Sequence, residues 1–269
     1  MKKSAENSIN IFVICTYILF WILFCLAGGS IYLKAPQFIQ TIMKYVCAWT
    51  STFVFVILFK KIYPDYSLFE YFKKQFTKVN IIDFAIPMII QILIMFIAIV
   101  CVLKIDNESV KNIKFVDFSE VPRLFIANIL YGPMGEELGW RSYALSVLQK
   151  KHSPLTASLI IGLLWGFWHF PLWFMSGYSG YALAIYILFF MVSLIELSVF
   201  LAFFYDQSKS ILVAIWIHFL FNFLLQIAVI DSLKLLGFTS LFYLIAILLI
   251  VLFNKDKMLS NQVKTLSVK

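Results

Sequence analysis

Residues 82–103 read IDFAIPMIIQILIMFIAIVCVL, with one charged side chain, Asp83, near the start. A helix needs about 20 apolar residues to cross the hydrocarbon core of a bilayer, and this stretch is long enough. Six further apolar runs meet or approach that length, namely residues 9–33, 40–59, 155–174, 181–204, 211–230 and 238–253. The chain is 62% hydrophobic and only 13% charged, which excludes a water-soluble domain with a polar surface. The sequence therefore predicts an all-α fold, a polytopic bundle of transmembrane helices.

An eighth span is predicted to begin near Val121, where Glu136, Glu137 and Arg141 hide it from a reading of hydropathy. The first apolar run is longer than the roughly 7–15 residues of a signal-peptide core, so we expect it to be retained as a span. Lysines are concentrated in alternate loops, and the positive-inside rule then places both termini in the cytoplasm. We therefore expect about eight spans in a single integral membrane domain, residues 1–269.

The net charge of +8 is spread over loops and forms no basic face interleaved with aromatic residues. We therefore expect the lipid bilayer, and no nucleic acid, as a partner. Lys-rich, Phe-rich and Arg-poor usage resembles that of low-GC Gram-positive bacteria, so the expected location is a bacterial plasma membrane. The sequence makes no prediction of the oligomeric state.

Ionisable side chains within the predicted spans are candidates for function, because burying a charge there costs about 2.5–3.5 kcal/mol on insertion scales. The candidates are Glu136, Glu137, Arg141, His169, Glu196 and His218, with Asn222 as an uncharged polar companion. At about 1.5 Å per residue, Glu136, His169 and Asn222 lie about 20–22 Å along their helices from loops on one membrane face, and His218 lies about 14 Å from such a loop. Separate helices thus bring these groups to a similar depth, as in sites built inside helix bundles.

Spacing within each helix adds a second constraint, since residues four apart share a face. Glu137 and Arg141 are expected to form a buried ion pair, which leaves Glu136, about 100° around the helix, to face a site. His218 and Asn222 can point at a common target, or can simply form hydrogen bonds between helices. For Glu196, a polar contact that stabilises the bundle is the favoured interpretation.

Three motifs contain these residues: EELGWR at 136–141, WGFWH at 165–169 and HFLFN at 218–222. They resemble, in order, the patterns EE-x3-R, F-x3-H and H-x3-N of the CPBP family of membrane-embedded CAAX proteases and bacteriocin-processing enzymes. The resemblance covers about residues 120–230, the helical core of the family. One departure is Trp165, where the family usually has Phe.

The resemblance implies an intramembrane endopeptidase of the glutamic type that hydrolyses a membrane-associated peptide or protein. It assigns activation of water to Glu136 and His169, stabilisation of the oxyanion to His218 and Asn222, and support to Glu137 and Arg141. A carboxylate in an apolar cavity is a stronger base than in water, and amide and imidazole N–H groups suit an oxyanion. The residues and the proposed chemistry are therefore compatible.

A metal-dependent reaction stays open, because Glu136, His169 and His218 supply two histidines and one carboxylate, as in some catalytic zinc sites of metalloproteases. HExxH is absent, and the resemblance favours the metal-independent form. Self-immunity to a bacteriocin and processing of a peptide pheromone are candidate roles. A non-catalytic immunity or scaffold protein and a proton-coupled transporter are the alternatives, the latter disfavoured because the sequence contains no inverted repeat.

Overall fold

The computed structural model describes residues 2–261, with side chains from residue 8 onward. Four helices in this part of the chain are long and apolar enough to cross a membrane: α1 (Lys2–Tyr32), α5 (Ile81–Ile105), α11 (Gly180–Ser208) and α13 (Ser232–Phe253). Helices α9 (Pro154–Trp168) and α12 (Ile211–Ile227) are apolar but shorter. The all-α, multi-pass membrane fold is confirmed, whereas eight spans and cytoplasmic termini stay predictions.

The run at 40–59 is not one straight helix, as the sequence suggested, but two. Helices α2 (Gln37–Ala48) and α3 (Thr50–Ile62) are bent by 55° at Trp49 and together count as a fifth candidate span. Trp49 donates its indole N–H to the carbonyl of Leu130 at 3.0 Å. The bend is therefore fixed by a side chain that anchors α2 and α3 to the end of another helix.

The segment that begins at Val121 is also broken. It consists of α6 (Val121–Leu130), α7 (Pro133–Glu137), the π-helix η3 (Leu138–Leu145) and α8 (Ser146–Leu148). Gly132 and Pro133 separate α6 from α7, because Pro is favoured at the first position of a helix and cannot continue one. The segment begins at Val121, as the sequence predicts, and its break at Gly132 lies about one helical turn before the two glutamates.

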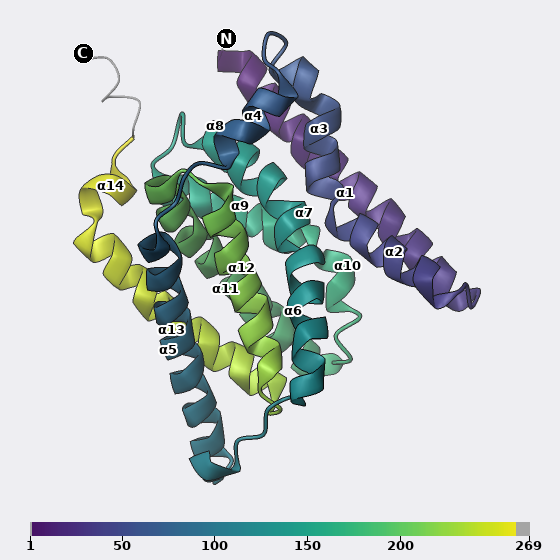
Figure 1. Cartoon of the computed structure of the whole chain (residues 1–269), viewed down its shortest axis with the longest axis vertical. Helices are drawn as coiled ribbons and strands as arrows, with labels where there is room; N and C mark the ends of the chain where they lie inside the picture. The colour runs from purple at the N-terminus through teal and green to yellow at the C-terminus, as the bar shows by residue number, and fades with distance from the viewer. Residues whose placement is uncertain (1, 262–269) are drawn as a thin grey trace.

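Helix α12 lies near the centre of the bundle, between α5 and α13 on one side and α6 and α7 on the other (Figure 1). Helix α11 packs on α9, α12 and α13. Short helices complete the fold: η1 (Val110–Asn112), η2 (Phe118–Glu120), α4 (Leu68–Gln75), α10 (Phe170–Trp173) and α14 (Lys255–Leu259). Between α5 and α6 the chain passes the end of α12, where Val116 N–H donates to the Ile227 carbonyl at 3.0 Å.

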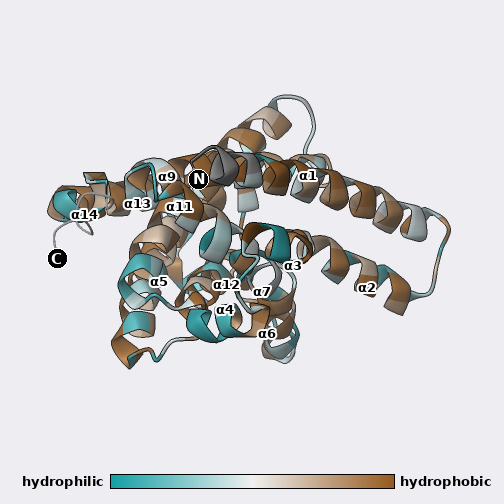
Figure 2. Ribbon diagram, turned by 90° about the horizontal axis from the view of Figure 1, so that it is seen from above, coloured by the Kyte–Doolittle hydropathy of each residue, from teal (hydrophilic) through white to brown (hydrophobic). Residues whose placement is uncertain are grey.

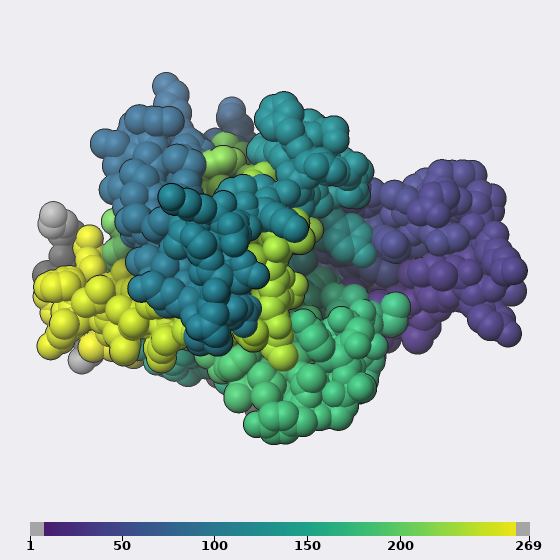
Figure 3. Space-filling model, turned by 90° about the horizontal axis from the view of Figure 1, so that it is seen from below, coloured from purple at the N-terminus to yellow at the C-terminus, as the bar shows by residue number. Residues whose placement is uncertain are grey.

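Helices α1 and α2 form a hairpin that projects from the body of the molecule (Figures 1 and 3). Its residues are largely hydrophobic (Figure 2), and exposed side chains include Ile18 and Ile22 of α1 and Phe38 and Ile42 of α2. A water-exposed hairpin of this composition would be unfavourable, because each exposed apolar side chain loses about 1.5–3 kcal/mol relative to burial. The hairpin therefore has the surface expected of a segment in contact with lipid.

Close approach of helices depends on glycine at several points in the bundle. A Cβ on Gly162 of α9 would lie 2.6 Å from the Cα of Ile195 in α11. A Cβ on Gly139 of η3 would lie 2.7 Å from the backbone of Ser51 in α3. Small residues at such contacts allow helix backbones to approach within a membrane.

We predict that Gly162→Ala lowers the free energy of unfolding in detergent by about 1–3 kcal/mol, because the added methyl group must push α9 away from α11. Gly29→Ala in α1 is the control, since nothing lies within 4 Å of a Cβ there. Thermal unfolding of both purified variants makes the comparison. Equal melting temperatures for the two would contradict the close packing of α9 on α11.

Candidate active site

The two glutamates lie where the broken segment changes its helical geometry. Glu136 is in the first turn of α7, and the chain passes after Glu137 into the wider turns of η3. π-Helical turns within helices occur frequently at functional sites. The side chains of Glu136 and Glu137 are both buried, with residue exposures of 4% and 0%, so each needs a polar partner inside the protein.

Glu137 has two such partners. The Nε of Arg141 lies 3.1 Å from its Oε2, and the Nδ1 of His218 donates to its Oε1 at 2.7 Å. The expected pairing of Glu137 with Arg141 is therefore present, while the bond to His218 was not anticipated. Because both oxygens of Glu137 are engaged, this residue joins η3 to α12 and leaves Glu136 as the carboxylate that faces the cavity.

Glu136 is held by the indole of Trp165, whose Nε1–H donates to Oε2 at 2.5 Å. Its other oxygen, Oε1, lies beside Gly132. A Cβ on Gly132 would lie 3.1 Å from Glu136 Oε1, 3.6 Å from the Nδ2 of Asn222 and 3.8 Å from the Cε1 of His218. A carboxylate oxygen, an amide and an imidazole thus meet beside Gly132, which leaves room for a small group there because it has no side chain.

Asn222 is positioned through its neighbours on α12. One turn further on, Gln226 donates its amide to the Asn128 side chain of α6 at 2.7 Å and to the backbone carbonyl of Asn222 at 3.0 Å. The polar contact between α12 and α6 fixes this end of α12 beside the break at Gly132. His218 and Asn222, four residues apart, therefore face the same point, as their spacing predicted.

His169 caps the end of α9 and reaches the cavity from a separate helix. Its Nδ1 lies 2.7 Å from the backbone carbonyl of Trp165. A carbonyl oxygen can only accept, so Nδ1 carries the hydrogen and Nε2 is the acceptor of the neutral ring. The ring packs edge-on against Trp168 and Phe190, with centroids 4.7 and 5.5 Å away. These contacts hold the orientation of the imidazole.

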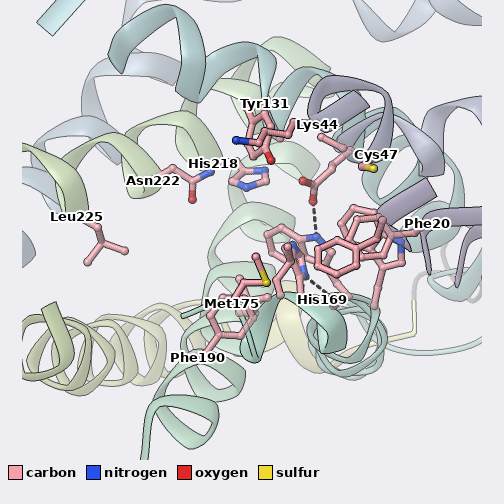
Figure 4. A pocket seen from close by; sticks show the side chains of 18 of the residues that line it. Phe20, Lys44, Cys47, Tyr131, His169, Met175, Phe190, His218, Asn222 and Leu225 are labelled. Carbon is pink, nitrogen blue, oxygen red and sulfur yellow. Dashed lines mark hydrogen bonds between the residues drawn. The ribbon is translucent and has the colours of Figure 1, made fainter. Parts of the chain in front are cut away.

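A cavity of 610 Å³ connects these groups. Glu136, His169, His218 and Asn222 all line it, so the structure brings the four predicted site residues to one space. Figure 4 shows His218 and Asn222 on one side of this space and His169, Met175 and Phe190 on another. The lining is otherwise mainly apolar, and Lys44 of α2 also contributes to it. Its apolar walls come from α1, α10 and α11, which suits a hydrophobic chain.

Glu196 is not part of this cavity. It accepts a hydrogen bond from Ser240 at 2.9 Å, which joins α11 to α13. The geometry matches the interpretation of Glu196 as a polar contact within the bundle.

The three side chains that the sequence offers as zinc ligands do not form a metal site among the described residues. Among the described residues, no three His, Cys, Asp or Glu side chains lie close enough together to hold a metal ion. Of the three proposed ligands, Glu136 is bonded to Trp165 and His218 is bonded to Glu137. In this arrangement these side chains do not fit a zinc ion, and the proposed reaction contains no step that involves one.

Part of this chain is similar in sequence to known proteins. Residues 118–224 match the family described as type II CAAX prenyl endopeptidase Rce1-like. CAAX prenyl protease 2 of Methanococcus maripaludis is 37% identical over 107 residues, which are 38% of this chain and 39% of the relative. Residues 118–224 are therefore similar to this family. The segment contains all three motifs and runs from η2 to α12, so the resemblance to membrane-embedded CAAX proteases is confirmed there.

The Rce1-like segment also contains a group that the sequence did not identify as important. Trp165 bonds Glu136, and the guanidinium carbon of Arg141 lies 4.1 Å from the centre of its ring. The signal available in the sequence was the spacing of Trp165 and His169, which are four apart and share a helix face. Only the structure shows that the indole N–H points at the glutamate.

We predict that Arg141→Met lowers the free energy of unfolding by about 3–5 kcal/mol, because it leaves the carboxylate of Glu137 buried without its cation. Arg123→Met is the matched control: Arg123, in the first turn of α6, pairs with Glu120 at the end of η2, and its side chain is 70% exposed. That pair contributes at most about 1 kcal/mol. Chemical unfolding in detergent compares the two, and similar losses would contradict a structural role for the buried pair.

Proposed function

We propose that this protein is a CAAX-protease-like intramembrane endopeptidase, which hydrolyses a peptide bond in a membrane-associated peptide or protein. The observation that supports this best is the meeting of Glu136, His218 and Asn222 beside Gly132, at the wall of a mainly apolar cavity. The match of residues 118–224 to the Rce1-like family supports the same reaction. The chain matches 39% of the length of its relative, so activity, substrate and partners of the whole protein are proposals.

In the proposed reaction, Glu136 is the general base. Its Oε1 takes a proton from a water molecule while the water oxygen bonds to the carbonyl carbon of the substrate. The Nε2 of His169, which its bond to the Trp165 carbonyl leaves as an acceptor, helps to orient that water. The proton then passes from Glu136 to the amide nitrogen as the carbon–nitrogen bond breaks, which yields a carboxylic acid and an amine.

His218 and Asn222 are the proposed donors to the oxyanion. Asn222 presents its Nδ2 hydrogens near Gly132. His218 donates from Nδ1 to Glu137, so it donates from Nε2 to the oxyanion as the imidazolium, in which both ring nitrogens carry a hydrogen. A donor in an oxyanion hole contributes about 2.7–4 kcal/mol in soluble enzymes. Glu137 and Arg141 support the site by holding His218 and η3 in place.

The proposed substrate has an apolar portion, because the cavity walls from α1, α10 and α11 are hydrophobic. In a bacterium, two roles fit such an enzyme: degradation of the producer's own bacteriocin, which gives self-immunity, and maturation of a peptide pheromone. Peptides of both kinds belong in the first substrate trial. A non-catalytic immunity or scaffold protein would protect cells equally well when Glu136 is replaced.

We predict that Glu136→Gln lowers the rate of peptide cleavage by about 10²–10⁴-fold, the usual contribution of a general base. Asn222→Ala is expected to lower it by about 10²–10³-fold through loss of an oxyanion donor. Glu196→Gln is the control, since this buried carboxylate contacts Ser240 and lies outside the cavity lining. Cleavage of membrane peptides by detergent-purified protein, followed by mass spectrometry, gives the rates. Retention of activity in well-folded Glu136→Gln would show that the base is another residue.

We propose that the reaction proceeds without a metal ion, since the described side chains do not assemble a set of ligands. Cleavage is then expected to continue at an unchanged rate after treatment with a strong chelator and dialysis. Loss of cleavage that zinc restores would instead indicate that substrate or metal binding draws Glu136, His169 and His218 together.

A further inference from the structure

Trp165 contacts four of the charged or titratable motif residues, namely Glu136, Arg141, His169 and His218. Its side chain is fully buried at 0% exposure near the end of α9. The indole N–H donates to Glu136, the ring face lies under Arg141, and the ring edge meets His218 at a centroid distance of 4.9 Å. Its backbone carbonyl accepts from His169. One residue thus links all three motifs.

The indole N–H distinguishes the two oxygens of Glu136. It donates to Oε2 at 2.5 Å, whereas Oε1 faces the space beside Gly132 where His218 and Asn222 also lie. Rotation of the carboxylate would break the bond to Trp165. The bond therefore fixes which oxygen is presented to the cavity.

The ring also determines which carboxylate receives the charge of Arg141. The guanidinium lies over the indole face, 4.1 Å from its centre, and forms its ion pair with Glu137. Glu136 is bonded instead by a neutral N–H donor. A full ion pair would favour the charged carboxylate more strongly than a neutral hydrogen bond does, and would make it a weaker base. Trp165 thus holds Glu136 in place without neutralising it.

Comparison with Trp168 shows that the hydrogen bond from the Trp165 N–H is specific to that residue. Trp168 is one turn further along α9, is 1% exposed and also touches His169. Its Nε1 has no hydrogen-bond partner among the described residues. Two buried indoles on one helix therefore differ in whether their N–H reaches a site residue.

We propose that Trp165 is a positioning residue for Glu136: its indole N–H holds Oε2, so that Oε1 is the atom that accepts the proton of the attacking water. The inference rests on the proposed endopeptidase function and names a contact that the family pattern does not supply, since Phe at this position has no N–H. The backbone bond to His169 is independent of the side chain. Substitution of the side chain therefore tests the N–H by itself.

The test is Trp165→Phe, with Trp216→Phe as its control, because the Nε1 of Trp216 has no hydrogen-bond partner among the described residues and Trp216 does not line the cavity. Trp165→Phe is expected to lower kcat about tenfold, which is the lower end of the effect of a hydrogen bond to a charged group, and to leave KM within twofold. Trp216→Phe is expected to leave both within twofold. Site-specific replacement of Trp165 by benzothienylalanine, which keeps the bicyclic ring but lacks the N–H, is expected to match Trp165→Phe.

The pH profile adds a readout that a role in packing would not move. The N–H stabilises the charged form of the carboxylate, so its loss is expected to move the acid limb of the kcat profile to higher pH. The titratable or charged groups around Glu136 are the same in all these variants: Glu137, Arg141, His169, His218, Lys44, Cys47 and Tyr131. The difference between the profiles of Trp165→Phe and Trp216→Phe therefore isolates the indole N–H of Trp165.

Two results would overturn the inference while the proposed function stands. One is an unchanged kcat and pH profile in well-folded Trp165→Phe, and the other is wild-type behaviour of the benzothienylalanine variant. Failure of the wild type to cleave any peptide would overturn the proposed function itself. Ultraviolet resonance Raman spectra of the indole N–H, compared between wild type and Glu136→Ala, separate the cases because they report the bond without any turnover.

Discussion

The buried ion cluster of Glu137, Arg141 and His218 is the interaction on which the rest of the site depends. In the interior of a membrane protein, a charge without a partner is very unfavourable, so the three side chains must stay together. Glu137 bonds Arg141 with one oxygen and His218 with the other. This requirement fixes η3 against α12. It also turns Glu136, the neighbouring residue, towards the cavity.

The same cluster requires backbones to approach closely, and the broken segment makes this possible. Gly135 and Gly139 lie against Trp49 and Ser51 at the junction of α2 and α3, with no room for a side chain. Gly132 keeps space open beside Glu136. A straight, regular helix of larger residues could neither pack against α3 nor leave a cavity at this depth. The irregular geometry and the polar residues are therefore parts of one arrangement.

Much of this arrangement could be predicted from the sequence, because apolar runs and intramembrane charges are unambiguous signals. The spacing of Glu137 and Arg141 predicted their ion pair, and the spacing of His218 and Asn222 predicted that they face one point. The bend at Trp49 could not be predicted, since it depends on a hydrogen bond to Leu130, 81 residues away in the sequence. Residues 40–59 form one continuous apolar run, so hydropathy alone predicts a single span there.

The role of Trp165 was hidden for a related reason. In the sequence it is an aromatic residue that replaces another aromatic residue, and hydropathy does not distinguish an indole N–H that bonds Glu136 from one without a partner, as at Trp168. Lys44 likewise lines the cavity, and its local sequence pattern does not indicate this. Contacts between side chains from distant segments thus decide the chemistry of the site, while local pattern decides its location.

In the proposed reaction, a water molecule activated by Glu136 hydrolyses a peptide bond within this cavity. Cleavage of membrane peptides in ¹⁸O-enriched water tests it directly, because the oxygen that attacks the carbonyl stays in the product. Wild-type protein is expected to produce a new C-terminal carboxylate carrying one ¹⁸O atom, and Glu136→Gln is expected to produce almost none. Equal labelled product from both proteins, or no product from the wild type with any peptide, would contradict it.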